Sequence, residues 1–460
     1  MPNRFRSFEL SLQKFLAPRQ ALLAALSFLA LGVLFAVLFR LGDLKLYVVE
    51  TIAICLAAGA IYLLALYLLE VSGDRPSAFW LILLGALLFR LTLFPLAPAL
   101  SDDIQRYRWD ARVQQAGFNP YSLSPDDLRL AALRDAGWRA IPGRDIPSIY
   151  PPLSELLWRV TYRYLPGTVA FKLPVLLADL CVVGMLAAWI RATGGRNFTL
   201  AIYAWNPLVV VEFAASGHHD ALAIAAVVAA SILIIRGRGT LSTLLLAAGA
   251  LFKLFPVVLF PIWLRRAGWP RSLWSWVNAF AAAVLAAVCA WPFRSALFGS
   301  QGGFNFSQLL DNLTYYQSRW QNNNASLYAL LSWCSGSTEV AAGIAAGVVA
   351  GLSIWAAARR VDSARAAYIL FAAILLLSPN AFPWYFTWLV PFLVFFPNPA
   401  WLLLTVVQFL SYHVLIGYQA AGIWHFEPRY LWLTYGPFYA LLLWQLFQPA
   451  SPAAPHSAPP

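Results

Sequence analysis

Long apolar segments constrain this chain more than any other feature of its sequence. Runs of about twenty mostly apolar residues, enough for a helix to cross a bilayer, recur from near residue 20 to near residue 448. Hydrophobic residues make up 61% of the 460 residues, and charged residues only 11%. A soluble domain needs about 25% charged residues to face water. The sequence therefore predicts an all-α polytopic membrane protein and excludes a soluble, disordered, collagen-like or disulfide-rich secreted chain.

The distribution of the net charge of +12 favours a lipid partner. Lysines and arginines are dispersed between the apolar segments, where they suit cytoplasmic loops and anionic lipid headgroups. We therefore expect the lipid bilayer as a partner and no nucleic acid. The four cysteines are scattered and show neither a disulfide framework nor a zinc ligand set: Cys55, Cys181, Cys289 and Cys334.

Positive charges set the expected orientation of the spans. The leader before residue 20 carries four cations and one acid, which places the N-terminus in the cytoplasm. Spans expected at 20–39, 46–69 and 78–98 then leave residue 101 on the outer side. Further spans are expected at 169–190, 199–213, 220–235, 273–293, 338–357, 365–378, 384–396, 399–416 and 430–448.

Residues 240–264 allow two interpretations, a single span or two half-helices broken near Lys253. The broken pair leaves more of the later cations on the cytoplasmic side, so the positive-inside rule favours it. Interrupted helices at membrane depth occur where they are buried in protein or line a wet cavity. We expect about 12–14 transmembrane helices, including this broken pair.

The polar and apolar stretches divide the chain into four expected parts. The first 100 residues form a cytoplasmic leader and three spans, and 169–448 form the transmembrane core with outer substrate loops. Between them, 101–168 is an extracytoplasmic catalytic loop. Its segments 102–117, 126–138 and 152–165 predict amphipathic helices on the membrane surface. The Pro-rich residues 449–460 are expected to be a disordered cytoplasmic tail.

Two adjacent carboxylates, Asp102 and Asp103, open the long outer loop. Such a pair at a bilayer boundary is costly unless it meets cations, water or a substrate. The nearby Arg106, Arg108 and Arg112 supply cations. The alternative interpretation is an acidic helix cap followed by a solvated surface helix.

A second polar cluster contains Glu212, His218, His219 and Asp220. It could bind a divalent ion, hydrogen-bond sugar hydroxyls or a phosphate, or form a structural turn. Adjacent histidines point in different directions on most backbones, which disfavours both as ligands of one metal. Lys253, alone in an apolar setting, either extends to the interface or neutralises a phosphate in a cavity.

Other polar and aromatic residues lie at expected loop positions. Asn119 and Tyr121 belong to a Gly-Asn-Pro turn, and Tyr150 precedes two prolines that suit a helix start. Asn380, Trp384 and Tyr385 follow a predicted span. These aromatics indicate either an interfacial belt or a substrate contact.

Together these motifs resemble a known family. Asp102-Asp103 with RYRWDARVQQAGFNPY, then YPPLSELLW, WNPLVVVEFAASGHHDAL, FKLFPVVLFP and LSPNAFPWYFTWLVP follow one another in this order. The region of about 100–400 is similar to bacterial polyprenol-phosphate-mannose-dependent mannosyltransferases of the GT-C fold. Two features depart from that pattern: three spans precede the acidic motif instead of one, and Phe382 stands where relatives often carry a polar residue.

The resemblance implies an inverting transfer of a sugar, mannose by family, from a polyprenyl-phosphate donor to a hydroxyl of a glycan or glycolipid acceptor. It places the reaction at the outer face of a bacterial cytoplasmic membrane. Asp102 or Asp103 would accept the hydroxyl proton, with Asp103 slightly favoured. The phosphate-binding candidates are Lys253, Arg106, Arg108, His218 and His219. The substrate-binding candidates are Asp220, Asn119, Tyr121, Tyr150, Glu212, Asn380, Trp384 and Tyr385.

The same resemblance implies that neither a metal nor a cofactor is required. Two other functions stay open. A transporter or flippase for lipid-linked sugars shares broken helices and midplane polar groups, but it does not obviously need a long outer loop headed by paired carboxylates. A polysaccharide polymerase that uses a polyprenyl-pyrophosphate donor is the enzymatic alternative.

Overall fold

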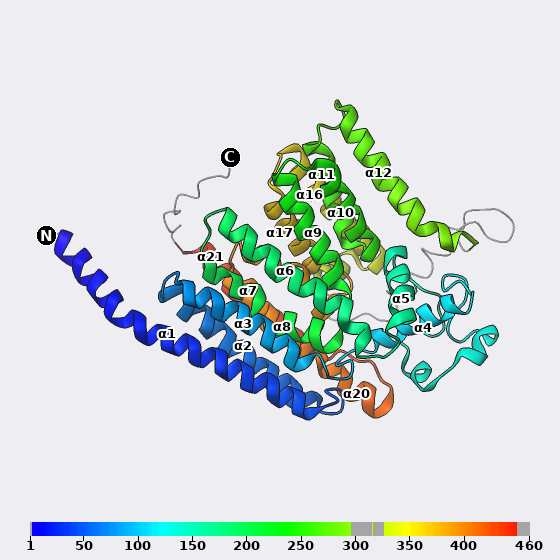
Figure 1. Ribbon diagram of the computed structural model, residues 1–460, viewed down its shortest axis with the longest axis horizontal. Helices are drawn as coiled ribbons and strands as arrows, with labels where there is room; N and C mark the ends of the chain where they lie inside the picture. Colours follow the sequence, from blue (N-terminus) through cyan, green and yellow to red (C-terminus); the bar gives the residue numbers. More distant parts are fainter. Residues whose placement is uncertain (1, 296–314, 316–325, 449–460) are drawn as a thin grey trace. The chain divides into compact units, whose positions relative to one another are not determined.

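The computed structural model describes residues 2–295, 315 and 326–448 (Figure 1). Within them every regular element is a helix, and no β-strand occurs. The prediction of an all-α polytopic chain is confirmed. The expected disordered tail, 449–460, lies outside the described residues.

The chain divides into two compact units. The first comprises Met1–Leu93, Val183–Val211 and Val390–Pro460, and the second comprises Phe94–Val182 and Glu212–Leu389. The helices of the first unit are α1 Pro2–Leu41, α2 Val48–Val71, α3 Pro76–Leu93, η4 Asn197–Leu200, α7 Ala201–Ala204, α8 Pro207–Val210, α18 Val390–Leu393, α19 Pro399–Val407, η9 Gln408–His413, α20 Val414–Ala421 and α21 Pro428–Leu446. The unit boundary falls within α6 Leu173–Ala192 and within η5 Val211–Ser216.

The helices of the second unit are α4 Asp103–Gln115, η1 Leu128–Leu133, η2 Ala136–Ala140, α5 Pro152–Tyr164, η3 Ala170–Lys172, α9 Asp220–Ile235, α10 Gly239–Phe252, η6 Phe255–Leu259, α11 Phe260–Arg266, α12 Leu273–Ala290, η7 Trp291–Phe293, α15 Ser326–Ser335, α16 Thr338–Ala358, α17 Ser363–Leu377 and η8 Pro383–Trp388. Two of the three predicted surface helices are present as α4 and α5, each within two residues of its expected bounds. The segment 126–138 instead contains the short 3-10 helices η1 and the start of η2.

Seven helices in the described part of the chain are long and apolar enough to cross a membrane. An eighth is counted if the bent pair Asn197–Ala204 and Pro207–Ser216 forms one span. The predicted number of about 12–14 is higher, because it included segments that fold as shorter helices. Three of these shorter apolar helices are Asp220–Ile235, Gly239–Phe252 and Ser363–Leu377.

The first unit contains a helix break that the sequence prediction missed. Residues 199–213 were expected to form one continuous span, but the pair bends by 50° at residues 205 and 206. The Asn206 side chain accepts hydrogen bonds from the amides of Leu208 and Val209, and Pro207 occupies the first helical position. An Asn cap followed by Pro is a strong signal for a new helix start, so the sequence held the information. In the same unit α1 packs along α2 and α3.

The expected break near Lys253 is confirmed in the second unit. Helix α10 ends at Phe252, and Lys253 has an extended backbone with φ −153° and ψ 141°. The chain resumes as η6, which carries Pro256 in its first turn, and then as α11. Because Pro256 has no amide hydrogen and restricts the residue before it, a continuous helix through this point is disfavoured.

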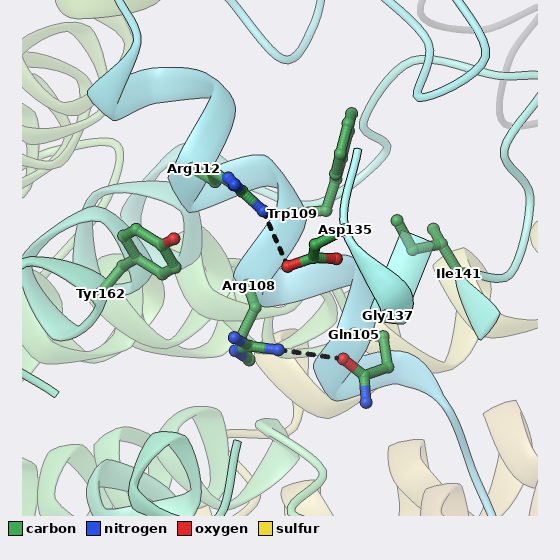
Figure 2. A pocket seen from close by; sticks show the side chains of 8 residues that line it. All are labelled: Gln105, Arg108, Trp109, Arg112, Asp135, Gly137, Ile141 and Tyr162. Atoms are coloured by element: carbon green, nitrogen blue, oxygen red, sulfur yellow. Dashed lines mark hydrogen bonds and ion pairs between the residues drawn. The ribbon is translucent and has the colours of Figure 1, made fainter. Parts of the chain in front are cut away.

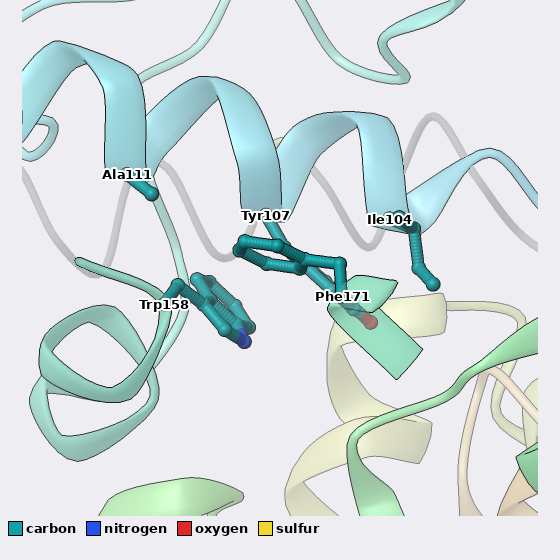
Figure 3. Packing of buried hydrophobic residues seen from close by; sticks show 5 residues of the cluster. All are labelled: Ile104, Tyr107, Ala111, Trp158 and Phe171. Atoms are coloured by element: carbon teal, nitrogen blue, oxygen red, sulfur yellow. The ribbon is translucent and has the colours of Figure 1, made fainter. Parts of the chain in front are cut away.

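Helix α4 has two faces that do different things. Gln105, Arg108 and Arg112 recur at helical spacing and border a surface pocket with Asp135 and Tyr162 (Figure 2). A neighbouring face, about 100° around the helix, is apolar. There Ile104, Tyr107 and Ala111 pack with Trp158 of α5 and with Phe171 (Figure 3). The buried face fixes the rotation of α4, and with it the direction of Asp103 at the helix start.

Candidate active site

Asp102 and Asp103 follow a tight turn at the start of α4. Leu100 is held in the left-handed region with φ 58°, an uncommon conformation for a side chain of this kind. The Ser101 hydroxyl oxygen accepts a hydrogen bond from the Asp103 amide at 3.2 Å. Asp102 occupies the N-cap position, but its side chain makes no capping hydrogen bond. Simple helix capping therefore does not explain the paired carboxylates.

The second polar cluster is carried by a π-helix, η5, and by the turn that follows it. Gly217 ends this segment with φ +78°, and a Cβ there would lie only 2.4 Å from Ile104 Cδ1. The ammonium group of Lys172, which is fully buried, donates to the carbonyls of Leu96, Ala214 and Ala215 at 2.8–3.2 Å. These contacts hold the turn that carries His218 and His219, here called the histidine turn, against the start of α4. Such π-helical turns are frequent at functional sites.

One chain of contacts links Asp103 to His218 and Glu212. Asp103 Oδ2 lies 3.8 Å from His218 Nε2, and His218 Nδ1 lies 2.9 Å from Glu212 Oε2. His218 and Glu212 are buried, whereas the Asp103 side chain is 18% exposed. The His218 ring also stacks on Trp384, with 4.0 Å between the ring centroids. A carboxylate with access to solvent is thus backed by a buried histidine and a buried acid.

A second chain of contacts links Asp220 to Lys253. The Lys253 ammonium donates to Asp220 Oδ2 at 3.0 Å, and the Trp388 indole donates to Asp220 Oδ1 at 2.6 Å. Lys253 also lies over the Tyr385 ring, 5.2 Å from its centroid. Its side chain is 18% exposed, so the ammonium group is neither fully buried nor free in solvent. Asp220 and Tyr385 together fix its position.

The two adjacent histidines face different partners, as the sequence prediction expected. His219 Nδ1 lies 2.9 Å from the Tyr107 hydroxyl, and Tyr107 stacks on Trp158 with 4.2 Å between centroids. The Tyr107 hydroxyl in turn lies 3.5 Å from Asp103 Oδ2. His219 therefore packs with the rings of Tyr107 and Trp158, whereas His218 Nε2 is the ring nitrogen near the Asp103 carboxylate.

The electrostatic setting suits Asp103 to a role as a base. Burial raises the pKa of the Asp103 carboxyl above its ordinary value, and the charges of His218 and Lys253 oppose that rise. A higher pKa makes the carboxylate a stronger base. Asp103 combines this basicity with partial exposure.

The structure does not bring Arg106 to this cluster. Its guanidinium group donates to both carboxylate oxygens of Asp110, at 3.1 and 2.9 Å, and to the carbonyls of Gly143 and Ile146. The side chain is only 4% exposed. These contacts hold the loop before α5 and direct Arg106 away from Asp103.

Arg108 lies on the opposite face of α4, in the pocket of Figure 2. It donates to the carbonyl of Pro166 at 2.9 Å and to Gln105 Oε1 at 3.2 Å. At about 100° per residue, positions 103 and 108 of a helix are separated by about 140°. Helical spacing alone was thus a signal that Arg108 and Asp103 diverge.

Four of the predicted substrate residues have structural contacts instead of a place beside Asp103. Asn119 donates to the carbonyl of Phe293 at 3.2 Å and accepts from the Tyr121 amide. The Tyr121 hydroxyl donates to the Tyr150 carbonyl at 2.5 Å, and the Tyr150 ring packs edge-on against Tyr107 and His219. Asn380 is 5% exposed, its backbone N–H donates to the Ser378 hydroxyl, and its side-chain Oδ1 has no hydrogen-bond partner.

Sequence reasoning missed three residues of the site: Tyr107, Lys172 and Trp388. Tyr107 has a recognisable signal, because it lies four residues after Asp103 and therefore on the same helical face. Trp388 lies four residues after the predicted Trp384. Lys172 has no local signal, since its three carbonyl partners come from two distant segments. Among the described residues, no group of three or more His, Cys, Asp or Glu side chains is placed to hold a metal ion.

Comparison with known proteins gives one family match. A family model described as alpha-(1->6)-mannopyranosyltransferase, N-terminal domain, of the MptA/B family matches residues 22–267. The match covers more than half of the 460 residues and includes Asp103, His218 and Lys253. It confirms the resemblance to mannosyltransferases. No curated protein and no solved structure matches the chain.

Proposed function

The chain belongs to the alpha-(1->6)-mannopyranosyltransferase family, and we propose that it transfers mannose from a polyprenyl-phosphate donor to a hydroxyl of a glycan or glycolipid acceptor. Membership assigns a mannosyl transfer activity in general. The lipid-phosphate donor, the GT-C mode of action and the formation of an α-(1→6) linkage are our proposal. The observation that carries it is the partly exposed Asp103 carboxylate, on which the charge of the Asp220-bound Lys253 ammonium acts.

Asp103 acts as the general base in this proposal. The acceptor hydroxyl attacks the anomeric carbon, and Asp103 accepts the hydroxyl proton as the new C–O bond forms. The bond between the anomeric carbon and the phosphate oxygen breaks in the same displacement. A single displacement inverts the anomeric configuration, so an α-linked product requires a β-linked donor. Asp102, at the N-cap of α4, contributes negative charge next to the base.

Lys253 stabilises the departing lipid phosphate. Positive charge that is already in position lowers the barrier to forming an anionic leaving group. The helix break is what presents the ammonium group here, because Lys253 follows the last residue of α10 and has an extended backbone. Asp220 and Tyr385 hold it in place. Arg106 and Arg108 are left out of the phosphate site, since their guanidinium groups are engaged elsewhere.

We place the reaction at the outer face of a bacterial cytoplasmic membrane, with the N-terminus in the cytoplasm. Three candidate spans, Arg19–Leu41, Val48–Val71 and Pro76–Leu93, precede Asp103. An odd number of crossings puts Asp103 on the side opposite to the cationic leader. The donor's polyprenyl chain would lie in the bilayer, and its sugar phosphate would reach the site at the membrane boundary.

The test uses the full-length protein in detergent with polyprenyl-phosphate-linked mannose and an α-(1→6)-linked mannooligosaccharide. Release of free polyprenyl phosphate and elongation of the acceptor are measured together, with and without EDTA. We expect release that depends on the acceptor, gives an α-(1→6) product and is unaffected by EDTA. Loss of activity in EDTA, restored by a divalent cation, would contradict the metal-independent mechanism.

Variants identify the roles of the two charged groups. Lys253→Met should raise the donor KM or lower kcat by about tenfold or more, and Lys253→Arg should recover part of this loss. If no polyprenyl-phosphate sugar is a donor but a polyprenyl-pyrophosphate glycan is, the polymerase function replaces ours. Substrate-dependent flux of a lipid-linked sugar across liposomes, unchanged in Asp103→Asn, would favour the transporter.

A further inference from the structure

His218 is positioned between two carboxylates that differ in exposure. Its Nε2 faces Asp103 Oδ2 at 3.8 Å, and its Nδ1 contacts Glu212 Oε2 at 2.9 Å. Glu212 and His218 are 0% and 1% exposed, whereas Asp103 is 18% exposed. Neither ring nitrogen of His218 makes a hydrogen bond in the structure. The buried ring therefore has room for a proton between the two carboxylates.

We propose that His218, held by Glu212, takes over the proton that Asp103 removes from the acceptor hydroxyl. This inference rests on the proposed function and assigns the pair a part in it. His218 acts through Asp103 and is therefore a positioning and proton-holding residue, distinct from the phosphate-binding role expected from the sequence.

The proton and electron balance is complete with these three side chains. The acceptor O–H bond breaks as its oxygen bonds to the anomeric carbon, and the phosphate leaves with the electron pair of the old glycosidic bond. Asp103 gains the proton. Its O–H bond then breaks as an N–H bond forms at His218 Nε2, which gives an imidazolium ion between two carboxylates. After product release the proton returns through Asp103 to water.

The 3.8 Å separation is consistent with this sequence of events. It exceeds a hydrogen-bond distance, so the two side chains share no hydrogen before the reaction. Protonated Asp103 carries a hydrogen that it can donate to His218 Nε2. The contact therefore becomes attractive only after Asp103 has accepted the proton from the acceptor hydroxyl. The stacked indole of Trp384, 4.0 Å from the His218 ring, then faces an imidazolium ion and stabilises it by a cation–π interaction.

Other charged groups surround the pair. Asp220, Lys253 and Asp102 act on Asp103 through their charges, and His219 and Asp220 interact electrostatically with His218. Asp220 is already bonded to Lys253 and Trp388, and His219 to Tyr107. Glu212 is the only one of these acids that contacts His218 Nδ1 among the described residues.

The experiment measures kcat/KM for polyprenyl-phosphate-linked mannose against pH with full-length wild type and with the His218→Gln, Glu212→Gln and His219→Gln variants. In wild type, activity is lost at low pH once Asp103 holds a proton before the reaction. His218→Gln removes the second proton site, so kcat should fall about 100-fold, and the acid limb should move to higher pH because the charge of His218 no longer opposes the raised pKa of Asp103.

Glu212→Gln keeps the size and hydrogen-bonding ability of the side chain while it removes the charge. It should move the acid limb in the same direction with a smaller loss of kcat, because the imidazolium loses one of its two anions. His219→Gln is the matched control, since His219 bonds to Tyr107, and its acid limb should coincide with that of wild type.

Lower kcat in both His218→Gln and Glu212→Gln with an unmoved acid limb would overturn the proposal and leave His218 as a packing partner of Trp384. A raised donor KM with an unmoved limb would assign His218 to the phosphate. If Asp103→Asn abolishes transfer while the limb is unmoved in the His218 variant, the proposed function stands and only this inference fails. Full activity of Asp103→Asn removes both.

Discussion

Two networks of acidic side chains begin on α4 and are built in opposite ways. In the first, Asp110 binds the guanidinium of Arg106, and Glu155 accepts from Ser148 at 2.5 Å and from Gln114 at 2.8 Å. The second network, described above, runs from Asp103 to His218 and Glu212. The first is buried throughout, whereas the second begins at a partly exposed carboxylate and contains a 3.8 Å gap.

We assign the Asp110 network to the stability of the fold and the Asp103 network to proton transfer. Buried polar groups are costly unless their hydrogen bonds are made, and the carboxylates of the Asp110 network make hydrogen bonds within the network. It therefore fixes the loop before α5 and leaves no acidic oxygen for a substrate. The Asp103 network keeps an acceptor exposed and a contact unmade, which is what a proton-transfer group requires. The predictions below test this difference.

The largest expected effect separates two aspartates on the same helix. Asp103→Asn should lower the rate of mannosyl transfer by about 10²- to 10⁴-fold, because the amide cannot accept the acceptor proton. Asp110→Asn, the matched control, should lower protein stability while each folded molecule keeps its rate. Transfer rates and thermal unfolding in detergent distinguish the two. Equal loss of rate in both variants would show that the networks do not differ in function.

Arg106→Met should be the most destabilising single change in the first network. It leaves the buried Asp110 carboxylate without its partner and frees the carbonyls of Gly143 and Ile146. Removal of one member of a buried ion pair costs about 3–5 kcal/mol. Denaturation in detergent measures the loss, and Arg112→Met, which breaks a partly exposed pair with Asp135, is the control. A comparable effect of both variants would contradict the structural role.

The first network should also give stability a specific pH dependence. Burial raises the pKa of Glu155 well above its ordinary value, and the nearby Asp110 adds to the rise. Folding therefore favours the protonated acid. The resulting contribution of Glu155 to the free energy of unfolding is complete below its unfolded pKa of about 4.3. It is lost as pH rises through its folded pKa. Glu155→Gln, which keeps a neutral side chain, should flatten that part of a plot of melting temperature against pH. Identical slopes would argue against a protonated Glu155.

Gly217→Ala tests the link between the histidine turn and α4. The new Cβ meets Ile104 Cδ1 at 2.4 Å and Lys172 Cγ at 2.8 Å, and φ is +78°. Strain and overpacking of this kind cost about 1–3 kcal/mol. We expect a lower melting temperature together with a lower kcat, because His218 shifts relative to Asp103. Gly194→Ala has a similar positive φ in open space and should lower stability only.

The smallest effect is expected at Arg108. Arg108→Ala should leave the donor KM unchanged, because the side chain lies in the pocket of Figure 2 and contacts Pro166 and Gln105. Loss of a charged hydrogen bond to the donor phosphate would raise KM by about tenfold or more. Steady-state kinetics with varied donor concentration decide the point. An increase of that size would return Arg108 to the phosphate site.

Local patterns predicted the backbone better than the side-chain partners. Periodicity and proline positions predicted α4, α5 and the break at Lys253. Asn206-Pro207 carries the same kind of signal, but the span at 199–213 was predicted from hydrophobicity alone. The cations that act with Asp103 were harder to predict, because Arg106 and Arg108 are the nearest ones along the sequence. Lys253, which the sequence had also suggested, lies 150 positions after Asp103, and only tertiary packing brings its helix break to Asp220.

Lysine placement has a practical consequence for chemical labelling. The sequence places only two lysines within residues 94–182 and 212–389, namely Lys172 and Lys253. Lys172 is fully buried on three carbonyl oxygens, so an amine-selective reagent has no approach to it in the folded protein. Lys253 retains 18% exposure. Mass spectrometry of the modified protein would therefore report occupancy of this region at a single amine, which polyprenyl phosphate should shield.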